Sequence, residues 1–469
     1  MAPHKTKVIL LSYLPFAISY LAYKSPELSF LIAWSGSFYI FHLTLFSRMQ
    51  VLSSDGGLRE QVLRPIVLIQ FVFAGFMCIT SIFYFLEHLN YFQFSMSQLT
   101  TKFERKTYLI AECQRLCVLA HAALITGMIA AGNARERPRY LLSIDPDSFL
   151  ILISILSGIL AHFTKQVPAV FQFSIGLNSI SLFSSAFLIV VGLRKKKVIN
   201  LVIGGAIFSF YVSSHLISGY KEAILIDFIL LIVLFFPYYR KRVVVISVFL
   251  GMALLYFLPT YTTVIRHFVW TGTGCIDEAK EHFFKLFSGE DSNNEIDMNN
   301  KEFFTTRLSE IGMFVKFAET TPDKLPYYGE QIFINALYAL IPRALWHEKP
   351  NTEEIAMRRV YSADVVDITS KVSAKTRPVV DGYLSAGAAG VFIDIFLYGW
   401  LAQYLCNKAE LLLGGYSLGC GLFYNSIFQH LWRGNNIEFL LNNVVYGTIL
   451  MLIIFAFLKL SGIISPNKC

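Results

Sequence analysis

The stretches Ile66–Leu86 (IVLIQFVFAGFMCITSIFYFL) and Pro168–Leu193 (PAVFQFSIGLNSISLFSSAFLIVVGL) contain no charged residue over 21 and 26 positions. Each is long enough to cross the hydrocarbon core of a bilayer, which is about 30 Å thick. The 469-residue chain as a whole has 55% hydrophobic and 15% charged residues and a mean hydropathy of +0.54. Soluble globular proteins carry about 25% charged residues. We therefore predict an integral membrane protein.

Twelve apolar windows predict an all-α polytopic membrane protein with about 12 transmembrane helices. The windows are 8–23, 28–46, 65–89, 108–131, 148–164, 168–193, 198–218, 222–238, 243–260, 383–405, 411–432 and 438–460. They divide the chain into a first membrane region, 1–260, a long polar segment, 261–382, and a second membrane region, 383–469.

The basic residues of the short loops predict the orientation. If the N-terminus is cytoplasmic, the inside loops carry 14 Lys or Arg and the short outside loops carry 7. The positive-inside rule then places both termini in the cytoplasm and the segment 261–382 outside it. The cytoplasmic loops also explain the net charge of +8, so we predict the lipid bilayer as a partner and no nucleic acid.

The extracytoplasmic loop 261–382 has its own predicted organisation. It contains 14 Lys or Arg and 18 Asp or Glu, so it is not a polybasic surface for membrane adhesion. Apolar residues recur at helical spacing in 303–319 and in 329–341. We expect two amphipathic helices that lie on the membrane helices.

Several kinds of site lack a sequence signal. The seven cysteines are scattered, mostly in or beside apolar windows, which predicts neither a disulfide framework nor a cysteine zinc site. The chain has no Gly-x-x-x-x-Gly-Lys-Ser/Thr, His-Glu-x-x-His or Gly-x-Ser-x-Gly motif, so ATPase, zinc protease and serine hydrolase functions are unsupported. The first outside loop, 24–27, has no Asp, unlike metal-dependent lipid-linked glycosyltransferases. We expect no metal and no cofactor.

The segment Ile341–Pro350 (IPRALWHEKP) is the strongest candidate for chemistry. Its two prolines fix the backbone φ angle on both sides, so the side chains between them should be held in place. Arg343 offers a planar fork of donors and Lys349 a point charge, and together they form a candidate diphosphate clamp. The alternative is that Arg343 pairs with Glu348 or caps the preceding helix.

Other charged residues on the outer side are further candidates. They are Lys221, Arg266, Arg307, Glu310, Arg377, Asp381 and Arg433. Lys221 lies at the outer end of the eighth window, where it either snorkels to the interface or faces a central cavity. Arg307 and Glu310 stand at i,i+3, so an exposed helix pair is the alternative to a role in a site.

These features resemble the O-antigen polymerase and ligase superfamily, in particular the Wzy-like oligosaccharide repeat-unit polymerases. The shared topology is about twelve spans, cytoplasmic termini and one long external loop before the tenth span. The motif similarity covers about 301–399 and comprises Thr305–Ser309 (TTRLS), Pro322, Gly329, Ile341–Pro350, Asp381-Gly382-Tyr383, Gly387, Gly390 and Gly399. One departure is Lys221, where such proteins often carry Arg, so bidentate recognition of phosphate is lost there.

The resemblance implies a glycosyltransferase of polysaccharide (lipopolysaccharide) biosynthesis in a bacterial inner membrane. Its substrate would be an oligosaccharide linked to polyprenyl (undecaprenyl) diphosphate, transferred at the outer face without a metal, with a chain-length regulator protein as a further partner. The candidate diphosphate-binding residues are Arg343, Lys349, Arg307, Lys221, Arg266, Arg377 and Arg433. The candidate general bases are His347, Asp381, Glu310 and Glu348. His347 ranks first because its reference pKa of about 6.5 suits proton transfer at neutral pH.

Three alternatives stay open. An O-antigen ligase would use the same donor but pass the glycan to a terminal acceptor. A polytopic transporter or flippase also has about twelve spans, although we find no internal repeat and alternating access does not need a 122-residue external loop. A membrane scaffold without catalysis would tolerate replacement of Arg343, Arg307 and Lys349.

Overall fold

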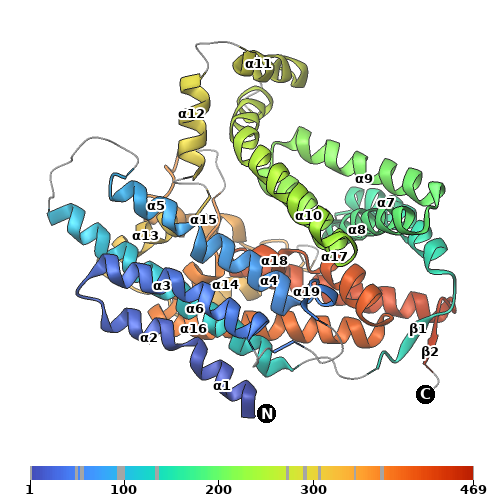
Figure 1. The fold of residues 1–469 in the computed structure, drawn as a ribbon, viewed down its shortest axis with the longest axis horizontal. Coiled ribbons are helices and arrows are strands. Elements are labelled where there is room, and N and C mark those ends of the chain that lie inside the picture. Colours follow the sequence, from blue (N-terminus) through green and yellow to red (C-terminus); the bar gives the residue numbers. More distant parts are fainter. Residues whose placement is uncertain are drawn as a thin grey trace. The chain divides into compact units, whose positions relative to one another are not determined.

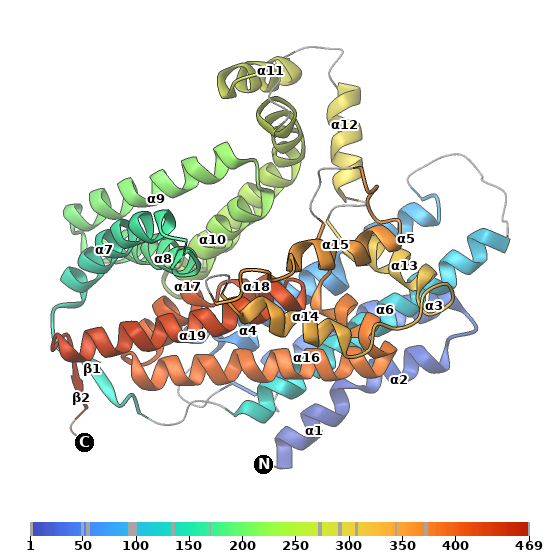
Figure 2. The ribbon, with the colours of Figure 1, turned by 180° about the vertical axis from the view of Figure 1, so that it is seen from behind.

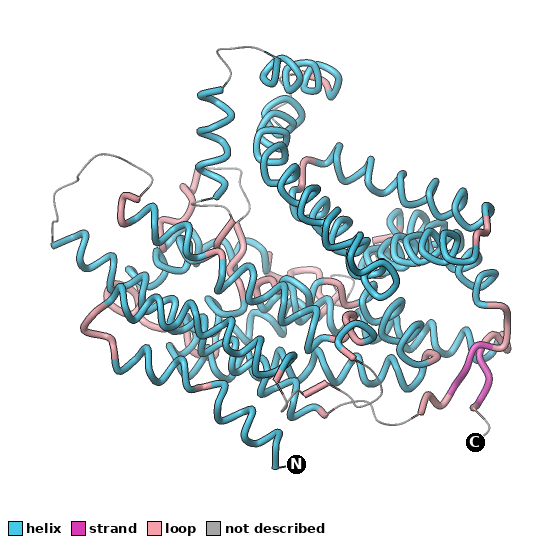
Figure 3. The backbone as a smooth tube through the Cα atoms, in the orientation of Figure 1, coloured by secondary structure: helices cyan, strands magenta, loops and turns pink. Residues whose placement is uncertain are grey.

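The structure is a computed structural model. It describes residues 3–47, 51–52, 57–91, 101–132, 137–168, 170–270, 274–288, 293–304, 308–342, 345–369 and 374–467. These residues are mostly helical, and Figure 3 shows one pair of short strands near the C-terminus. Nine helical stretches among them are long and apolar enough to cross a membrane, so the chain is a helical membrane protein. They are Pro26–Phe46, Pro65–His88, Phe103–Ala131, Pro146–Gln166, Phe171–Lys195, Val198–Ser218, Lys221–Phe268, Pro378–Leu412 and Ile437–Leu460.

The first apolar window forms two short helices instead of one long one. Helix α1 (Pro3–Ser12) ends before Tyr13, and α2 (Leu14–Leu21) follows with Pro15 in its first turn. Proline lacks a backbone N–H and is tolerated in a first turn but not inside a helix. The helix therefore breaks here, although the hydrophobicity continues.

The eighth and ninth windows form α10 (Lys221–Ile265), two helical halves joined by a kink, where the sequence predicts two helices joined by a cytoplasmic loop. Tyr239 has non-helical backbone angles (φ −128°, ψ 37°), and Pro237 lies two residues before it. A proline inside a helix removes a hydrogen bond and kinks the axis. The basic cluster 240–242 therefore follows a kink and lies in helix, not in a loop.

The eleventh window begins with a sharp reversal of the chain. Helix α16 (Pro378–Leu412) ends before Gly414 and Gly415, whose φ angles are +82° and +77°. Such angles strongly favour glycine. The window then forms the π-helix η7 (Tyr416–Tyr424) and the short helices α17 (Asn425–Ile427) and α18 (His430–Arg433).

The chain folds as two compact units. The first comprises Met1–Ser143, His162–Gly176 and Ser309–Cys469, and the second comprises Ile144–Ala161 and Leu177–Leu308. The segment 261–382, which the sequence predicts to be external, is therefore divided between the units.

In the first unit, α6 (Thr101–Ala131) runs along α16 (Figure 1). A Cβ atom on Gly127 would lie 2.0 Å from the Phe396 carbonyl oxygen, and one on Gly399 would lie 2.2 Å from the Leu124 carbonyl oxygen. Small residues allow this close approach of backbones, as is common between membrane helices. The remaining N-terminal elements of this unit are α3 (Pro26–Phe41), η1 (His42–Phe46), η2 (Leu58–Glu60), α4 (Pro65–Phe73), η3 (Ala74–Ile79) and α5 (Ser81–His88).

The C-terminal part of the first unit contains the helices of the segment 261–382 that concern the site. They are α13 (Ile311–Thr320), α14 (Gln331–Leu340) and α15 (Thr352–Ser362), followed after α16 by α19 (Ile437–Leu460). Helix α13 is shorter than the predicted helix at 303–319, whereas α14 agrees with the prediction for 329–341. Helix α14 packs against α19 (Figure 2). Strands β1 (Tyr140–Leu142) and β2 (Ile464–Pro466) pair antiparallel.

The second unit is built around α10. It also contains α9 (Val198–Ser218), η4 (Arg266–Trp270), α11 (Ile276–Ser288) and α12 (Asn293–Glu302). Helices α7 (Pro146–Gln166) and α8 (Phe171–Lys195) belong mainly to this unit and partly to the first.

Candidate functional site

A cavity of about 810 Å³ lies in the first unit. Its walls come from the segment before and at the start of α8, the end of α14 with the loop after it, the start of α15, the residues before α16 and the start of α19. This volume is in the range of about 300–1,000 Å³ typical of small-molecule sites. Its polar wall residues are Gln172, His347, Lys349, Thr352, Glu353, Lys375, Asn436, Glu438, Asn442 and Tyr446.

Lys349 is held at the end of α14. Its Nζ donates to the carbonyl oxygens of Ala339 at 3.0 Å and Ile341 at 2.8 Å. The last carbonyls of a helix lack partners within the helix and attract cations. Lys349 thus caps the C-terminal end of α14, a role that the sequence leaves open for Arg343. The Lys349 side chain still lines the cavity.

Two further ionisable side chains face the cavity near Lys349. His347 is exposed and belongs to the same loop, and Glu353 lies in the first turn of α15. The Asn351 side chain caps α15 by accepting from the Glu353 backbone N–H at 3.2 Å. This cap fixes the backbone from which Glu353 projects.

Lys375 contributes a second cation from the chain just before α16. Its Nζ lies 4.5 Å from the centroid of the Phe439 ring, which also lines the cavity. An ammonium over an aromatic face is attracted by the ring quadrupole. Lys375 is therefore held against the wall at the start of α19.

A buried ionic network supports the same wall. The Arg359 Nη1 and Nη2 atoms donate to the two Glu438 carboxylate oxygens at 2.6 and 3.0 Å, and Nη2 also reaches Asp381 Oδ1 at 3.3 Å. Arg359 and Glu438 are each 3% exposed and Asp381 is fully buried. The planar fork of the guanidinium matches a carboxylate in this bidentate arrangement.

The network ties the first turn of α16 to the first turn of α19. The Thr376 hydroxyl donates to Asp381 Oδ1 at 2.6 Å, and the Ile437 backbone N–H donates to Asp381 Oδ2 at 2.8 Å. The Asn436 amide donates to Glu438 Oε2 at 3.0 Å. Both Asp381 oxygens are therefore engaged, and Glu438 alone of the three ions reaches the cavity wall.

The charge state of Arg359 is set by its surroundings. Burial lowers the pKa of Arg359, but the Asp381 and Glu438 carboxylates raise it by more, so the pKa lies above its ordinary value. The guanidinium therefore stays charged throughout the working pH range.

Glu310 and Arg377 form a second ion pair in this unit. Arg377 Nη2 and Nε lie 3.0 and 3.2 Å from Glu310 Oε1, and Nη1 donates to the Gly434 carbonyl oxygen at 3.1 Å. The Arg377 side chain is 14% exposed and the Glu310 side chain is 19% exposed. The pair joins the start of α13 and the start of α16 to the turn before α19.

The model of one protein family, described as Domain of unknown function (DUF8712), matches residues 14–466. The chain belongs to this family. The DUF8712 match contains every residue that lines the cavity. No curated protein and no solved structure matches the chain.

The sequence-predicted residues of this DUF8712 domain fall into three groups. His347 and Lys349 line the cavity. Asp381 lies behind its wall in the buried network, while Glu310 and Arg377 pair with each other. Glu348, the fourth candidate base, does not line the cavity. Thus six of the eleven predicted residues lie in the unit that holds the cavity and have described side chains.

Lys221 and Arg266 belong to the second unit, which does not hold the cavity. Lys221 Nζ lies 4.7 Å from the centroid of the Phe303 ring. Arg266 Nε donates to the Gly219 carbonyl oxygen at 3.2 Å, at the C-terminal end of α9. The predictions for Arg307 and Arg343 lie outside the described residues, as does that for the side chain of Arg433.

Sequence reasoning missed four charged residues of the cavity and its wall: Glu353, Arg359, Lys375 and Glu438. Glu438 carried a usable signal, because an acid at the edge of a long apolar window is costly unless it has a partner. Arg359 falls on the buried face of α15 with Ala356 and Val360. Its helical spacing from these two apolar residues distinguishes Arg359 from its exposed neighbour Arg358.

Potential metal ligands also come together elsewhere in the described part of the chain. Cys406, Glu410 and Cys420 place one ligand atom each within 4.8 Å of one another. None of these three residues lines the cavity.

Proposed function

We propose that the chain polymerises polyprenyl-diphosphate-linked oligosaccharide repeat units by glycosyl transfer without a metal. The observation that carries this proposal is the cavity whose wall combines His347, Lys349 and Lys375 with carboxylates. The resemblance to Wzy-like polymerases supports it. We place the protein in the bacterial inner membrane, with both termini in the cytoplasm and the cavity on the outer face.

The two lysines suit the donor. When the bond between the sugar C1 atom and the diphosphate oxygen breaks, the electron pair leaves with the diphosphate, and negative charge develops there. Lys349 and Lys375 are held by the α14 carbonyls and by the Phe439 ring, so their charges need little reorganisation. Fixed cations stabilise such developing charge most in a poorly hydrated site.

His347 suits the acceptor. Its ring would take the proton of the attacking sugar hydroxyl as the new bond to C1 forms, and later release it to water. Among the candidate bases named from the sequence, His347 is the one that lines the cavity. Asp381 has both oxygens engaged in the buried network, and Glu310 is paired with Arg377, so both are positioning residues in this proposal.

The apolar part of the wall suits the lipid carrier. Val167, Ile341, Met357 and Phe439 line the cavity beside the polar groups. A polyprenyl chain can stay in the bilayer while its diphosphate enters a site with apolar and cationic walls.

The test is the glycan pattern on gels of cells that lack the gene and are complemented with variants. We expect Lys375→Ala and His347→Ala to reduce the polymer ladder by about 100-fold, since one stabilising donor contributes about that much to a rate. Lys324→Ala is the matched control, an exposed lysine of the same external segment that does not line the cavity. Membrane levels of all variants are compared.

The outcomes separate the candidate functions. A single repeat unit attached to its acceptor, without a ladder, supports the polymerase. Full-length polymer stranded on the polyprenyl carrier would mean a ligase. An unchanged ladder in both cavity variants at normal membrane levels would refute the proposal and favour a transporter or scaffold.

A further inference from the structure

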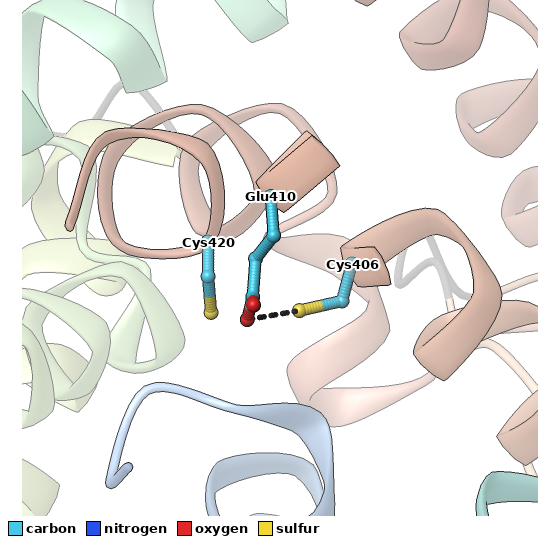
Figure 4. Close-up of side chains that lie close together, drawn as sticks. All are labelled: Cys406, Glu410 and Cys420. Carbon is cyan, nitrogen blue, oxygen red and sulfur yellow. Dashed lines mark hydrogen bonds between the residues drawn. The ribbon is translucent and has the colours of Figure 1, made fainter. Parts of the chain in front are cut away.

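A second group of reactive side chains lies at the C-terminal end of α16. Figure 4 shows Cys406 and Glu410 of α16 and Cys420 of η7 converging on one point. Cys406 and Cys420 are fully buried and Glu410 is 6% exposed. Cys406 Sγ donates to Glu410 Oε1 at 3.8 Å. A glutamate is rarely buried unless it is paired, and Glu410 is paired with Arg64.

The local fold brings these three side chains together. Cys406 and Glu410 stand at i,i+4, which places them on one face of α16. The glycine turn after α16 reverses the chain, and η7 then packs closely against α16. A Cβ atom on Gly419 would lie 2.3 Å from the Ala409 carbonyl oxygen. This close approach carries the next residue, Cys420, to the Cys406–Glu410 face.

The charges around the group are balanced for a divalent cation. Arg64 Nε and Nη2 donate to the two Glu410 oxygens at 3.0 and 3.1 Å, so the pair is neutral while the cysteines are thiols. Two thiolates and one carboxylate would carry three negative charges, which a divalent ion and the Arg64 guanidinium would balance. Burying a net charge is costly, so this balance matters inside the fold.

We propose that Cys406, Glu410 and Cys420 bind one Zn²⁺ ion. Tetrahedral zinc with bonds of about 2.3 Å to sulfur and about 2.1 Å to oxygen has ligand–ligand edges of roughly 3.6–3.8 Å. The Sγ–Oε1 distance of 3.8 Å already fits such an edge, and all ligand atoms lie within 4.8 Å. Each carboxylate oxygen has a second lone pair, so Glu410 can keep its bonds to Arg64.

The chemistry of the ligands selects the ion. Thiolates favour zinc over magnesium or calcium, which prefer oxygen ligands. Binding releases the two thiol protons to water as two sulfur–zinc bonds form. A fourth ligand is within reach, because the Leu63 carbonyl oxygen lies 3.4 Å from Cys420 Sγ. The ion would join α16 to η7 near the loop before α4. This proposal differs from the sequence-based expectation of no cysteine zinc site.

The test is elemental analysis of the full-length protein purified in detergent from zinc-supplemented cells. We expect about one zinc per chain in the wild type and less than about a tenth of that in Cys406→Ser and Cys420→Ser, since losing even an outer-shell partner lowers metal affinity 10–100-fold. Cys113→Ser is the matched control, because Cys113 is buried in α6 outside the group. Wild-type zinc content no higher than that of the two variants would overturn the proposal.

A measurement on the wild type covers the case in which the serine variants fail to fold. After zinc is removed with a chelator, added Co²⁺ should produce sulfur-to-metal charge-transfer absorption that Zn²⁺ abolishes. Zinc should also protect Cys406 and Cys420 from alkylation but not the exposed Cys275. A disulfide between Cys406 and Cys420, or no cobalt absorption, would contradict the proposal. These readouts do not depend on glycan polymerisation.

Discussion

Replacing Arg359 with alanine removes the guanidinium that lies between Glu438 and Asp381. All three side chains are at most 3% exposed, and the Arg359 nitrogens lie 2.6 to 3.3 Å from the carboxylate oxygens. Removing one partner of a buried ion pair costs about 3–5 kcal/mol, because the remaining charge stays buried without compensation. The unfolding entropy is about 2.1 cal/mol/K per residue, so for cooperative unfolding of the whole chain each kcal/mol of lost stability lowers the Tm by about 1 °C. We expect the apparent Tm in detergent to fall by about 3–5 °C.

The neighbouring residue supplies the control for this prediction. Arg358 pairs with Glu354 at 3.0 Å, but the two side chains are 71% and 59% exposed. Such a surface pair is worth at most about 0.5 kcal/mol, so Arg358→Ala should lower the apparent Tm by less than about 1 °C. Heating each variant and measuring the monodisperse fraction by size-exclusion chromatography compares them directly. Equal shifts for Arg358→Ala and Arg359→Ala would refute the buried network.

Two further predictions concern packing and the second ion pair. Gly399→Val should abolish accumulation of the protein in membranes, because a Cβ atom at position 399 would lie 2.2 Å from the Leu124 carbonyl oxygen. The control is Gly205→Ala, which should be harmless because nothing lies within 4 Å of a Cβ atom at position 205. Immunoblots of membrane fractions check both variants. Comparable membrane levels would contradict the α6–α16 packing. Arg377→Lys should lower the apparent Tm by about 2 °C, because a lysine cannot reproduce the fork of donors and a hydrogen bond to a charged group contributes about 2 kcal/mol. An unchanged Tm would show that the pair with Glu310 adds no stability.

The membrane class and many helices could be predicted because hydrophobic length alone decides them. The window 198–218 coincides with α9, and the window 168–193 lies close to α8. The kink that joins the two halves of α10, in place of a loop, could not be predicted from charge. The basic residues after Tyr239 are typical of a loop, but long basic side chains can also extend to water from a helix.

The site was predictable only where its residues are neighbours in sequence. His347 and Lys349 lie two positions apart between two prolines, and both line the cavity. The contact between Arg359 and Glu438 joins residues 79 positions apart, so it depends on how α14 packs against both α15 and α19. Cys406 and Cys420 were set aside because they lie in or beside apolar windows, yet the chain reversal at the two glycines brings them together.

The most direct test of the central claim is polymerisation by the purified protein, without added metal, in liposomes that contain a polyprenyl-diphosphate-linked oligosaccharide. We predict a ladder of longer lipid-linked glycans with one polyprenyl diphosphate released for each new bond, and about 100-fold less product from Lys375→Ala than from Lys324→Ala. Absence of both polymer and released polyprenyl diphosphate from folded wild-type protein would contradict the account.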